Sequence, residues 1–259
     1  MCFRSSFLLA FVFLVSGLAV AQQQSQRDPQ ALLVVQQSLA AMGGATAAAQ
    51  VTDAVCTGAV QPVARSQVKA STFTWKIKGT DFRYQSSTGS STRIFVSGHG
   101  HPASVRDGVV KALSPHMALA NPPFELPALV LAPEASDTRY TVTLGGSSTV
   151  EGTAAIKVHT RLETDVVTSL VTAQDWYFDV VTRLPLRVEH RLPDNLRPDH
   201  YVNAAEEYSD FRVVSGMLVP FRISLYEDGV QVAIVTLDSV KFNQGLSGAD
   251  FDAPQGGGQ

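Results

Sequence analysis

The sequence predicts a mainly β protein with a few short helices, built on one large, strongly curved antiparallel sheet. From about residue 54 onward, apolar and polar residues alternate with a period of two, which is typical of strands with one buried face. Helical patterns are confined to a segment near the N-terminus and to the proline-rich stretch 112–133. No internal repeat or linker divides the chain, so a single domain over residues 29–254 is expected.

The composition excludes two classes of protein. Of the 259 residues, 45% are hydrophobic and 17% are charged, whereas a disordered chain needs the opposite balance. The formal net charge is −3, and a surface that binds nucleic acid normally has an excess of Lys and Arg. We therefore expect a folded protein that has no nucleic-acid partner.

Residues 1–21 have the three parts of a secretory signal peptide. Arg4 supplies the positive charge, residues 7–15 form an apolar run, and Ala19 and Ala21 provide the small residues of a cleavage site. The apolar run is too short for a membrane-spanning helix, which needs about 20 residues. We expect cleavage near Ala21 and a periplasmic or secreted location.

Cys56 is the single cysteine of the expected mature chain, so no intramolecular disulfide can form. A free thiol in an oxidising compartment survives best when it is buried, and the neighbouring Val55 and Val60 suit a core position. A nucleophilic thiol would need a nearby base and some exposure. A buried structural cysteine is therefore favoured.

A helix is predicted after a flexible leader at residues 22–28. Asp28 suits the N-cap and Pro29 the first helical position, and Gly43-Gly44 ends the helix because glycine accepts a left-handed conformation. The apolar stripe of this helix contains Leu32, Val35, Leu39 and Met42.

About eleven strands are predicted, four before the proline-rich stretch and seven after it. The clearest alternations cover residues 72–78, 81–85, 91–97, 139–144, 156–162, 175–179, 184–189, 219–225 and 230–234. Hairpin turns are expected at Gly79-Thr80, Ser215-Gly216 and Asp228-Gly229, and loops at 98–101 and 193–203. Closing or half-closing such a sheet protects its edges.

The stretch 112–133 interrupts the β pattern with an apolar, proline-rich sequence. Its prolines are Pro115, Pro122, Pro123, Pro127 and Pro133. Each proline removes a backbone donor, so two short helices near 113–120 and 125–132 are predicted instead of one long helix. Together with the N-terminal helix, this stretch is the element available to cover the concave apolar face.

Three motifs in the C-terminal half carry a family resemblance: DWYFD at 175–179 with LPLR at 184–187, YSDFR at 208–212 with VPFR at 219–222, and VKFN at 240–243. They resemble hairpins and the final strand of LolA/LolB-like periplasmic proteins, the outer-membrane lipoprotein-sorting-protein-like superfamily. Arg183 stands where the family pattern has glycine. Most of these positions are turn and core residues, so the resemblance concerns fold more than function.

The resemblance implies a half-open β-barrel of about eleven strands whose mouth is plugged by short helices. In the best-known members, the apolar cavity carries the acyl chains of lipoproteins across the periplasm. For this chain the resemblance implies a hydrophobic ligand, such as a lipid or a lipoprotein acyl chain, and allows for a membrane-associated partner protein. Transfer of the carrier role is an analogy, because one fold supports many functions.

The histidines offer one tempting metal motif. His99 and His101 are two residues apart and could share one ion, but a site needs further ligands and Cys56 is the only thiol available. A solvated loop is favoured, and no metal or cofactor is expected. By alternation, His159 and His190 are predicted to lie on the outward, polar faces of their strands.

No catalytic constellation is visible in the sequence. The chain has no Gly-x-Ser-x-Gly elbow, His-Glu-x-x-His helix or phosphate-binding glycine loop. Glu163, Asp165, Asp175 and Asp179 gather in one region, but most fall in turns or on the polar face and are interpreted as solubility charges. We expect no enzymatic activity.

The inward-facing apolar side chains are the stronger candidates for a ligand site. The cavity candidates are Trp75, Tyr140, Trp176, Phe178, Phe221 and Ile223. The alternative is an ordinary packed core, since small barrels fill themselves with side chains. The stretch 112–133 is predicted to be a movable lid, with the candidates Leu113, Met117, Phe124, Leu126 and Leu129.

Three functional hypotheses follow from these observations. The first is a carrier or binding protein for a hydrophobic ligand. The second is a non-catalytic structural or interaction module with a solid core and surface-bound partners. An unrecognised hydrolase comes last, because no nucleophile is apparent in the sequence.

Overall fold

The computed structural model describes residues 26–63, 69–120, 123–193 and 201–254. The expected signal peptide, most of the expected leader and the expected C-terminal tail lie outside the described residues.

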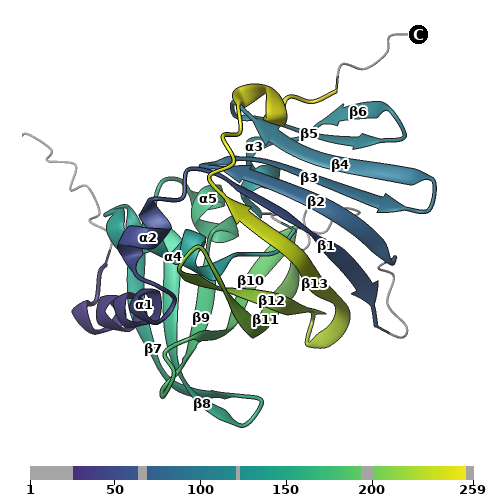
Figure 1. The fold of residues 1–259 in the computed structure, drawn as a ribbon. Coiled ribbons are helices and arrows are strands. Elements are labelled where there is room, and N and C mark those ends of the chain that lie inside the picture. The colour runs from purple at the N-terminus through teal and green to yellow at the C-terminus, as the bar shows by residue number, and fades with distance from the viewer. Residues whose placement is uncertain (1–25, 64–68, 121–122, 194–200, 255–259) are drawn as a thin grey trace, which may run out of the picture.

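In the described part of the chain, one antiparallel sheet of thirteen strands has the order β6-β5-β4-β3-β2-β1-β13-β12-β11-β10-β9-β8-β7 (Figure 1). The strands are β1 (Ala54–Pro62), β2 (Ser71–Lys78), β3 (Asp81–Thr88), β4 (Ser91–Gly98), β5 (His101–Arg106), β6 (Val109–Ala112), β7 (Tyr140–Val150), β8 (Thr153–Leu162), β9 (Gln174–Asp179), β10 (Pro185–Pro193), β11 (Tyr201–Val214), β12 (Met217–Glu227) and β13 (Val230–Phe242). The pair β1–β13 joins the two halves, and β6 and β7 are the edges. The sheet is thus not closed, which confirms the predicted half-open architecture.

Two strands more than expected come from the region of the predicted Gly-His loop. That loop is a tight turn between β4 and β5, in which His99 and Gly100 have φ angles of 54° and 77°. Strand β6 then adds to β5. Its four residues are all exposed, so they show no alternation of apolar and polar positions that would reveal a strand.

The described helices are α1 (Pro29–Ala41), α2 (Ala45–Ala49), α3 (Pro115–Ala120), α4 (Pro127–Ser136), α5 (Val166–Val171) and the 3₁₀ helix η1 (Gly248–Phe251). As predicted, the side chain of Asp28 caps α1. Gly43 has a φ of 115°, and a Cβ there would lie 2.5 Å from the carbonyl oxygen of Gly216. Glycine therefore allows the end of α1 to approach β12, where Leu218 N donates to Met42 O at 2.9 Å.

Helix α4 extends beyond its predicted end and contains Pro133 in its interior. An external donor stabilises this last part. The guanidinium of Arg27, from the expected leader, donates to the carbonyl oxygens of Ala135 (2.6 Å), Asp137 (2.7 Å), Tyr140 (2.9 Å) and Glu134 (3.4 Å). Arg27 also forms a parallel bridge with Val142, so this end of the leader is held in place. A positive charge suits the C-terminal end of a helix.

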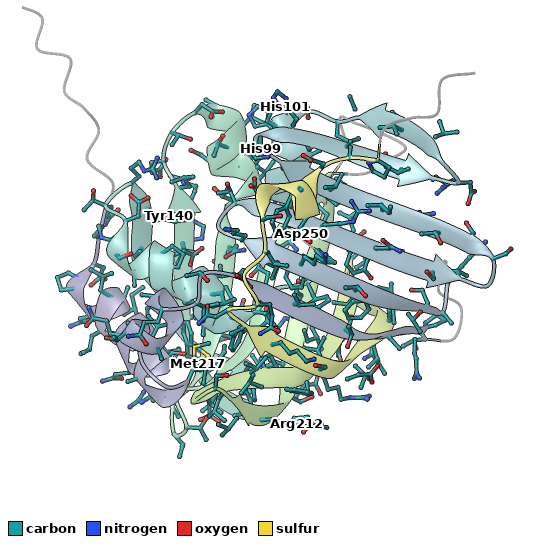
Figure 2. All side chains as sticks on the ribbon, turned by 45° about the horizontal axis from the view of Figure 1, so that its top comes forward. His99, His101, Tyr140, Arg212, Met217 and Asp250 are labelled. Atoms are coloured by element: carbon teal, nitrogen blue, oxygen red, sulfur yellow. The ribbon has the colours of Figure 1, made fainter. Side chains whose placement is uncertain are left out.

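Helices α1, α2 and α4 share one hydrophobic core with both halves of the sheet. Figure 1 shows α4 on the concave side, between α1 and the strands of the C-terminal half. On the opposite face of β2–β4, the C-terminal segment crosses the sheet, and Figure 2 shows Asp250 on this crossing. Asp250 pairs with Lys76 at 2.7 Å, and Arg83 donates to Asp252 O at 3.0 Å.

Candidate functional site

The cavity candidates from the sequence lie on the concave side of the sheet. Five of them are buried, and Tyr140 packs against the same core with partial exposure. The buried five are Trp75 on β2, Trp176 and Phe178 on β9, and Phe221 and Ile223 on β12. Trp176 stacks at 6.3 Å between ring centroids on both Phe178 and Tyr208. Their role in ligand binding stays a prediction.

A short segment covers this apolar face, and we call residues 123–136 the cover segment. Its Phe124 is fully buried, with its ring edge-on to Trp75 at 4.6 Å and to Phe73 at 5.4 Å between centroids. Leu126 is also buried, and Leu129 packs against the core. The cover segment thus fills the space between the two halves of the sheet with its own side chains.

The remaining lid candidates lie in and before α3. Leu113 and Met117 are both partly exposed, and Leu113 N donates to Pro102 O on β5 at 2.9 Å. Helix α3 contacts β5, β10 and α5, so it crosses from one half of the sheet to the other. It is a separate element from the cover segment.

Three buried glutamates, which the sequence analysis missed, lie where the cover segment meets the sheet: two belong to the segment and one to β11. We call Glu125, Glu134 and Glu206 the acid cluster; their exposed fractions are 5%, 4% and 4%. Glu125 N donates to Glu206 Oε2 at 2.9 Å, and the hydroxyl of Tyr208 donates to the same oxygen at 3.1 Å. Gln174 donates to Glu125 Oε1 and accepts from the indole of the neighbouring tryptophan.

Burial raises the pKa values of all three carboxyls. It raises the pKa of Glu206 to about 7 and that of Glu134 to about 8. The pKa of Glu125 is well above its usual range because of burial first, and then because of the charges of the other two. The three carboxyls are therefore largely neutral below about pH 6.

Two of these acids had a signal in the sequence. In α4, Glu134 continues the buried stripe of Ala128 and Leu131 at helical spacing. In β11, Glu206 alternates with Ala204 and Tyr208 and so shares their inward face. A charged residue at a core position of a periodic pattern is the feature to look for.

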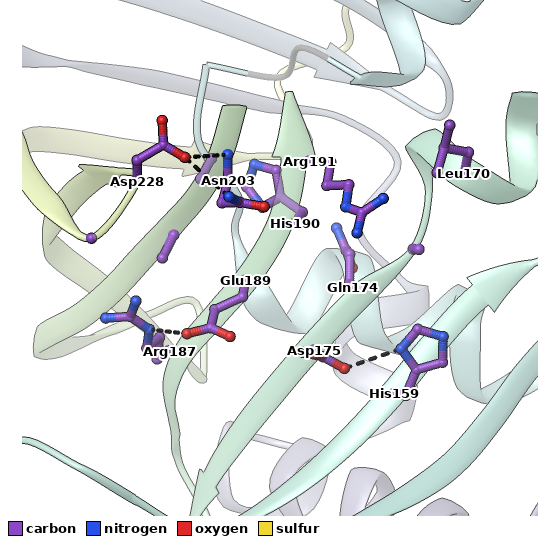
Figure 3. A pocket seen from close by; sticks show the side chains of 14 residues that line it. His159, Leu170, Gln174, Asp175, Arg187, Glu189, His190, Arg191, Asn203 and Asp228 are labelled. Atoms are coloured by element: carbon purple, nitrogen blue, oxygen red, sulfur yellow. Dashed lines mark hydrogen bonds and ion pairs between the residues drawn. The ribbon is translucent and has the colours of Figure 1, made fainter. Parts of the chain in front are cut away.

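A pocket of about 670 Å³ lies at the ends of β9, β10 and β11 (Figure 3). Asp175 and Glu189 line it from the outward face, while Gln174 and His190 line it from the row that faces inward. Because Gln174 also donates to Glu125, a single side chain connects this pocket with the acid cluster.

The structure contradicts the predicted environment of one histidine, His190. His190 was expected to face outward, but it alternates with the fully buried Val188 and lies on the same inward side. Its Nδ1 is buried without a hydrogen-bond partner, and burial lowers its pKa to about 4. His159 does face outward, and its Nδ1 lies 3.0 Å from Asp175 Oδ1. Figure 3 marks this pair with a dashed line. His99 lies in an exposed turn.

Other predicted residues have structural partners. Asp165 caps α5 by accepting from two backbone N–H groups, and Asp179 does the same for the following turn. Glu163 accepts from Arg161. Cys56 is fully buried as predicted, and burial raises its pKa to about 12. Among the described residues, no group of three or more His, Cys, Asp or Glu side chains could hold a metal ion.

No helix in the described ranges is long and apolar enough to span a membrane.

Comparison with known proteins reveals relatives by structure. No protein-family model matches the chain, and no curated protein matches it in sequence. A LolA superfamily protein from Nitrosomonas europaea has a TM-score of 0.58 at 11% identity, covering 86% of this chain and 97% of its own. A DUF1329 family protein from Desulfovibrio piger has a TM-score of 0.57 at 13% identity, covering 88% of this chain and 98% of its own.

A third solved structure has a related description. It is a putative outer membrane lipoprotein-sorting protein domain from Vibrio parahaemolyticus, with a TM-score of 0.54 at 14% identity, covering 85% of this chain and 95% of its own. Identities this low establish the architecture and leave the ligand open. The chain has the fold of the LolA superfamily, as its C-terminal motifs predicted.

Proposed function

We propose that the chain is a periplasmic or secreted carrier or binding protein for a hydrophobic ligand, such as a lipid or a lipoprotein acyl chain. The ligand would lie on the concave face of the sheet, against Trp75, Trp176 and Phe178. The cover segment would move aside and be replaced by the apolar chain of the ligand.

The observation that carries this proposal is the position of the Phe124 ring against the aromatic side chains of the sheet. Its ring lies edge-on to Trp75 and Phe73, on a separate short segment that belongs to neither half of the sheet. An acyl chain could make equivalent apolar contacts there, because such contacts depend on buried area and are non-directional. The short helix α4 gains little from helix cooperativity of its own, which favours displacement.

A solid structural or interaction module is the second candidate. Trp176, Phe178 and Ile223 are each at most 1% exposed, and a core filled so completely favours a permanent cap. In that case the partners would bind the outer surface instead.

Native mass spectrometry of the mildly purified protein separates these two functions. The carrier predicts a bound mass that organic extraction removes and that returns on incubation with a long-chain fatty acid. A clean apo mass under both conditions, with no binding of a fluorescent fatty acid, would favour the solid module. N-terminal sequencing of the exported protein should begin at Gln22, and an intact Met1 would contradict the expected cleavage.

A further inference from the structure

Three carboxyls lie where the cover segment meets the sheet, and the proposed carrier function gives them no role. Glu125 precedes α4 and Glu134 lies near its end, so the cover segment has one acid at each end. Glu206 belongs to the sheet and accepts a hydrogen bond from the backbone N–H of Glu125. The acid cluster therefore spans the contact between the cover segment and the sheet.

None of the described Lys, Arg or His side chains pairs with these carboxyls. Arg27 donates its hydrogen bonds to backbone carbonyl oxygens at and after the end of α4 and to none of the three carboxyls. Burial lowers the pKa of the partly exposed His190 on β10 to about 4, so its ring is neutral above that pH. The other titratable groups that face the cluster are Tyr140 on β7 and Tyr208 on β11, and burial raises the pKa of both hydroxyls.

The hydrogen bonding of the cluster suits neutral carboxyls. Oε2 of Glu125 and Oε2 of Glu134 are buried without any partner. An ionised carboxylate in such a place would lose its hydration without compensation, and neighbouring negative charges would repel it. A neutral carboxyl has a much smaller desolvation cost, so the closed arrangement favours the protonated form.

The acid cluster lies next to the pocket at the strand ends. Gln174 lines this pocket and its side chain donates to Glu125. Local opening of the cover segment would expose the carboxyls to water, so their protonation can follow the external pH without unfolding of the sheet.

We propose that the acid cluster is a proton-dependent switch, in which neutral carboxyls keep the cover segment closed on the sheet and their ionisation opens it. The switch regulates the site of the proposed carrier function, on which its biological use rests. It is nevertheless a property of the ligand-free chain and can be tested without any ligand.

The direction of the switch follows from the closed and open environments. In water a glutamate has its ordinary pKa near 4.5, whereas the closed cluster raises the values to about 7 for Glu206 and about 8 for Glu134. The closed state is therefore fully favoured below about pH 4.5 and loses its advantage as the pH rises to about 8. His190 acts in the opposite direction, because its neutral buried form is lost as the pH falls from 6.5 toward 4.

Hydrogen exchange of the ligand-free protein tests the switch. Exchange is measured at about pH 5.5 and about pH 8.5 and corrected for the intrinsic pH dependence of amide exchange, and we expect protection of residues 123–136 to fall at least tenfold. Protection of the β12 and β13 peptides should stay above that of the cover segment at both pH values. Equal protection of the cover segment at both pH values would overturn the proposal for the unmodified chain.

Amide variants identify the groups responsible. Glu206→Gln and the double variant Glu125→Gln/Glu206→Gln mimic neutral carboxyls, so the cover segment should stay protected at the higher pH. The matched control is Glu207→Gln, the next residue in β11, which faces outward and pairs with Arg187. An unchanged pH dependence in a folded double variant would overturn the proposal. Should that variant fail to fold, the infrared band of protonated carboxyls in the unmodified protein decides, because its absence at about pH 5.5 excludes neutral acids.

Failure of the switch and failure of the carrier function give different results. If the cover segment opens with rising pH but the protein binds no fatty acid, the switch is supported and the carrier function is contradicted. If the protein binds fatty acid equally at both pH values and the protection of residues 123–136 stays constant, the carrier function is supported and the switch is contradicted.

Discussion

Glu206 and Glu207 are neighbours in β11 and have opposite environments. Glu206 faces the cover segment, is 4% exposed, and has its pKa raised to about 7 by burial. Glu207 faces outward, where Arg187 donates to it at 2.7 Å and the hydroxyl of Tyr226 donates at 2.7 Å. The same side chain is thus a neutral acid or a paired carboxylate depending on which face of the strand it occupies.

The contrast extends across both faces of the C-terminal half. On the outward face, Asp175 lies 2.6 Å from Lys157 and 3.0 Å from His159, and these partners lower its pKa although partial burial opposes them. On the inward face the acid cluster has no such partners among the described residues. The outward face is therefore built to keep charge, and the inward face is built to exclude it.

The largest effect is expected for the inward aromatic of β9. Trp176→Ala should cost about 3–5 kcal/mol in the free energy of unfolding, because a fully buried side chain leaves a cavity. Denaturant melts measure this cost, with Phe221→Ala for comparison. A loss near zero at both positions would show that these side chains line an open space instead of a packed core.

The next largest effect is expected at Glu206 and Glu207 in β11, where the same substitution should change the stability in opposite directions. At about pH 8.5, Glu206→Gln should stabilise the protein by on the order of 2–3 kcal/mol, because a raised folded pKa penalises the ionised state. This gain should vanish at about pH 3.5, below the unfolded pKa of 4.5, where the carboxyl is largely protonated in both states. Glu207→Gln should destabilise slightly by weakening the pair with Arg187. Melts at both pH values test the comparison, and equal signs for the two variants would contradict it.

The end of α4 provides a third test of the inward side. Arg27→Ala removes the hydrogen bonds to the carbonyl oxygens of α4 and should cost about 1–3 kcal/mol. Arg27→Lys keeps the charge but cannot reach as many acceptors, so its cost should be intermediate. Faster hydrogen exchange in residues 127–136 would locate the effect, and a loss spread evenly over the sheet would contradict it.

The smallest effect is expected for the outward neighbour of the buried tryptophan. Tyr177→Phe removes the hydroxyl that donates to Glu189 at 2.9 Å and should cost about 0.5–1.5 kcal/mol. Because Arg187 still pairs with Glu189, no unpaired charge remains. A loss of unfolding free energy as large as that of Trp176→Ala would contradict the proposed difference between the outward and inward faces.

Local patterns predicted much of this molecule. Alternation placed Trp75, Trp176 and Ile223 on the inward side, and Asp228-Gly229 forms the expected hairpin turn, with φ angles of 47° and 78°. Arg183, at the position where the family pattern has glycine, adopts a φ of 64°, in the left-handed region that glycine enters most readily.

Features that depend on distant contacts could not be predicted in this way. The pairing of β1 with β13 joins the ends of the chain and has no local signal. Arg27 lies in a polar stretch, and only the folded position of α4 gives it acceptors. The acid cluster forms because the fold brings Glu125, just before α4, to the distant Glu206 on β11, with Glu134 of α4 close enough for its charge to raise the pKa of Glu125. Solubility is the usual interpretation of such charges until tertiary contacts are known.

Hydrogen exchange of the cover segment with and without a long-chain fatty acid tests the central claim most directly. If residues 123–136 are displaced by ligand, their amides should exchange through local opening at free energies well below that of global unfolding, and added fatty acid should change their protection. The strands β12 and β13 should be unaffected. Exchange in the cover segment as slow as in these strands, unaltered by fatty acid, would establish a permanent cap and contradict the carrier function.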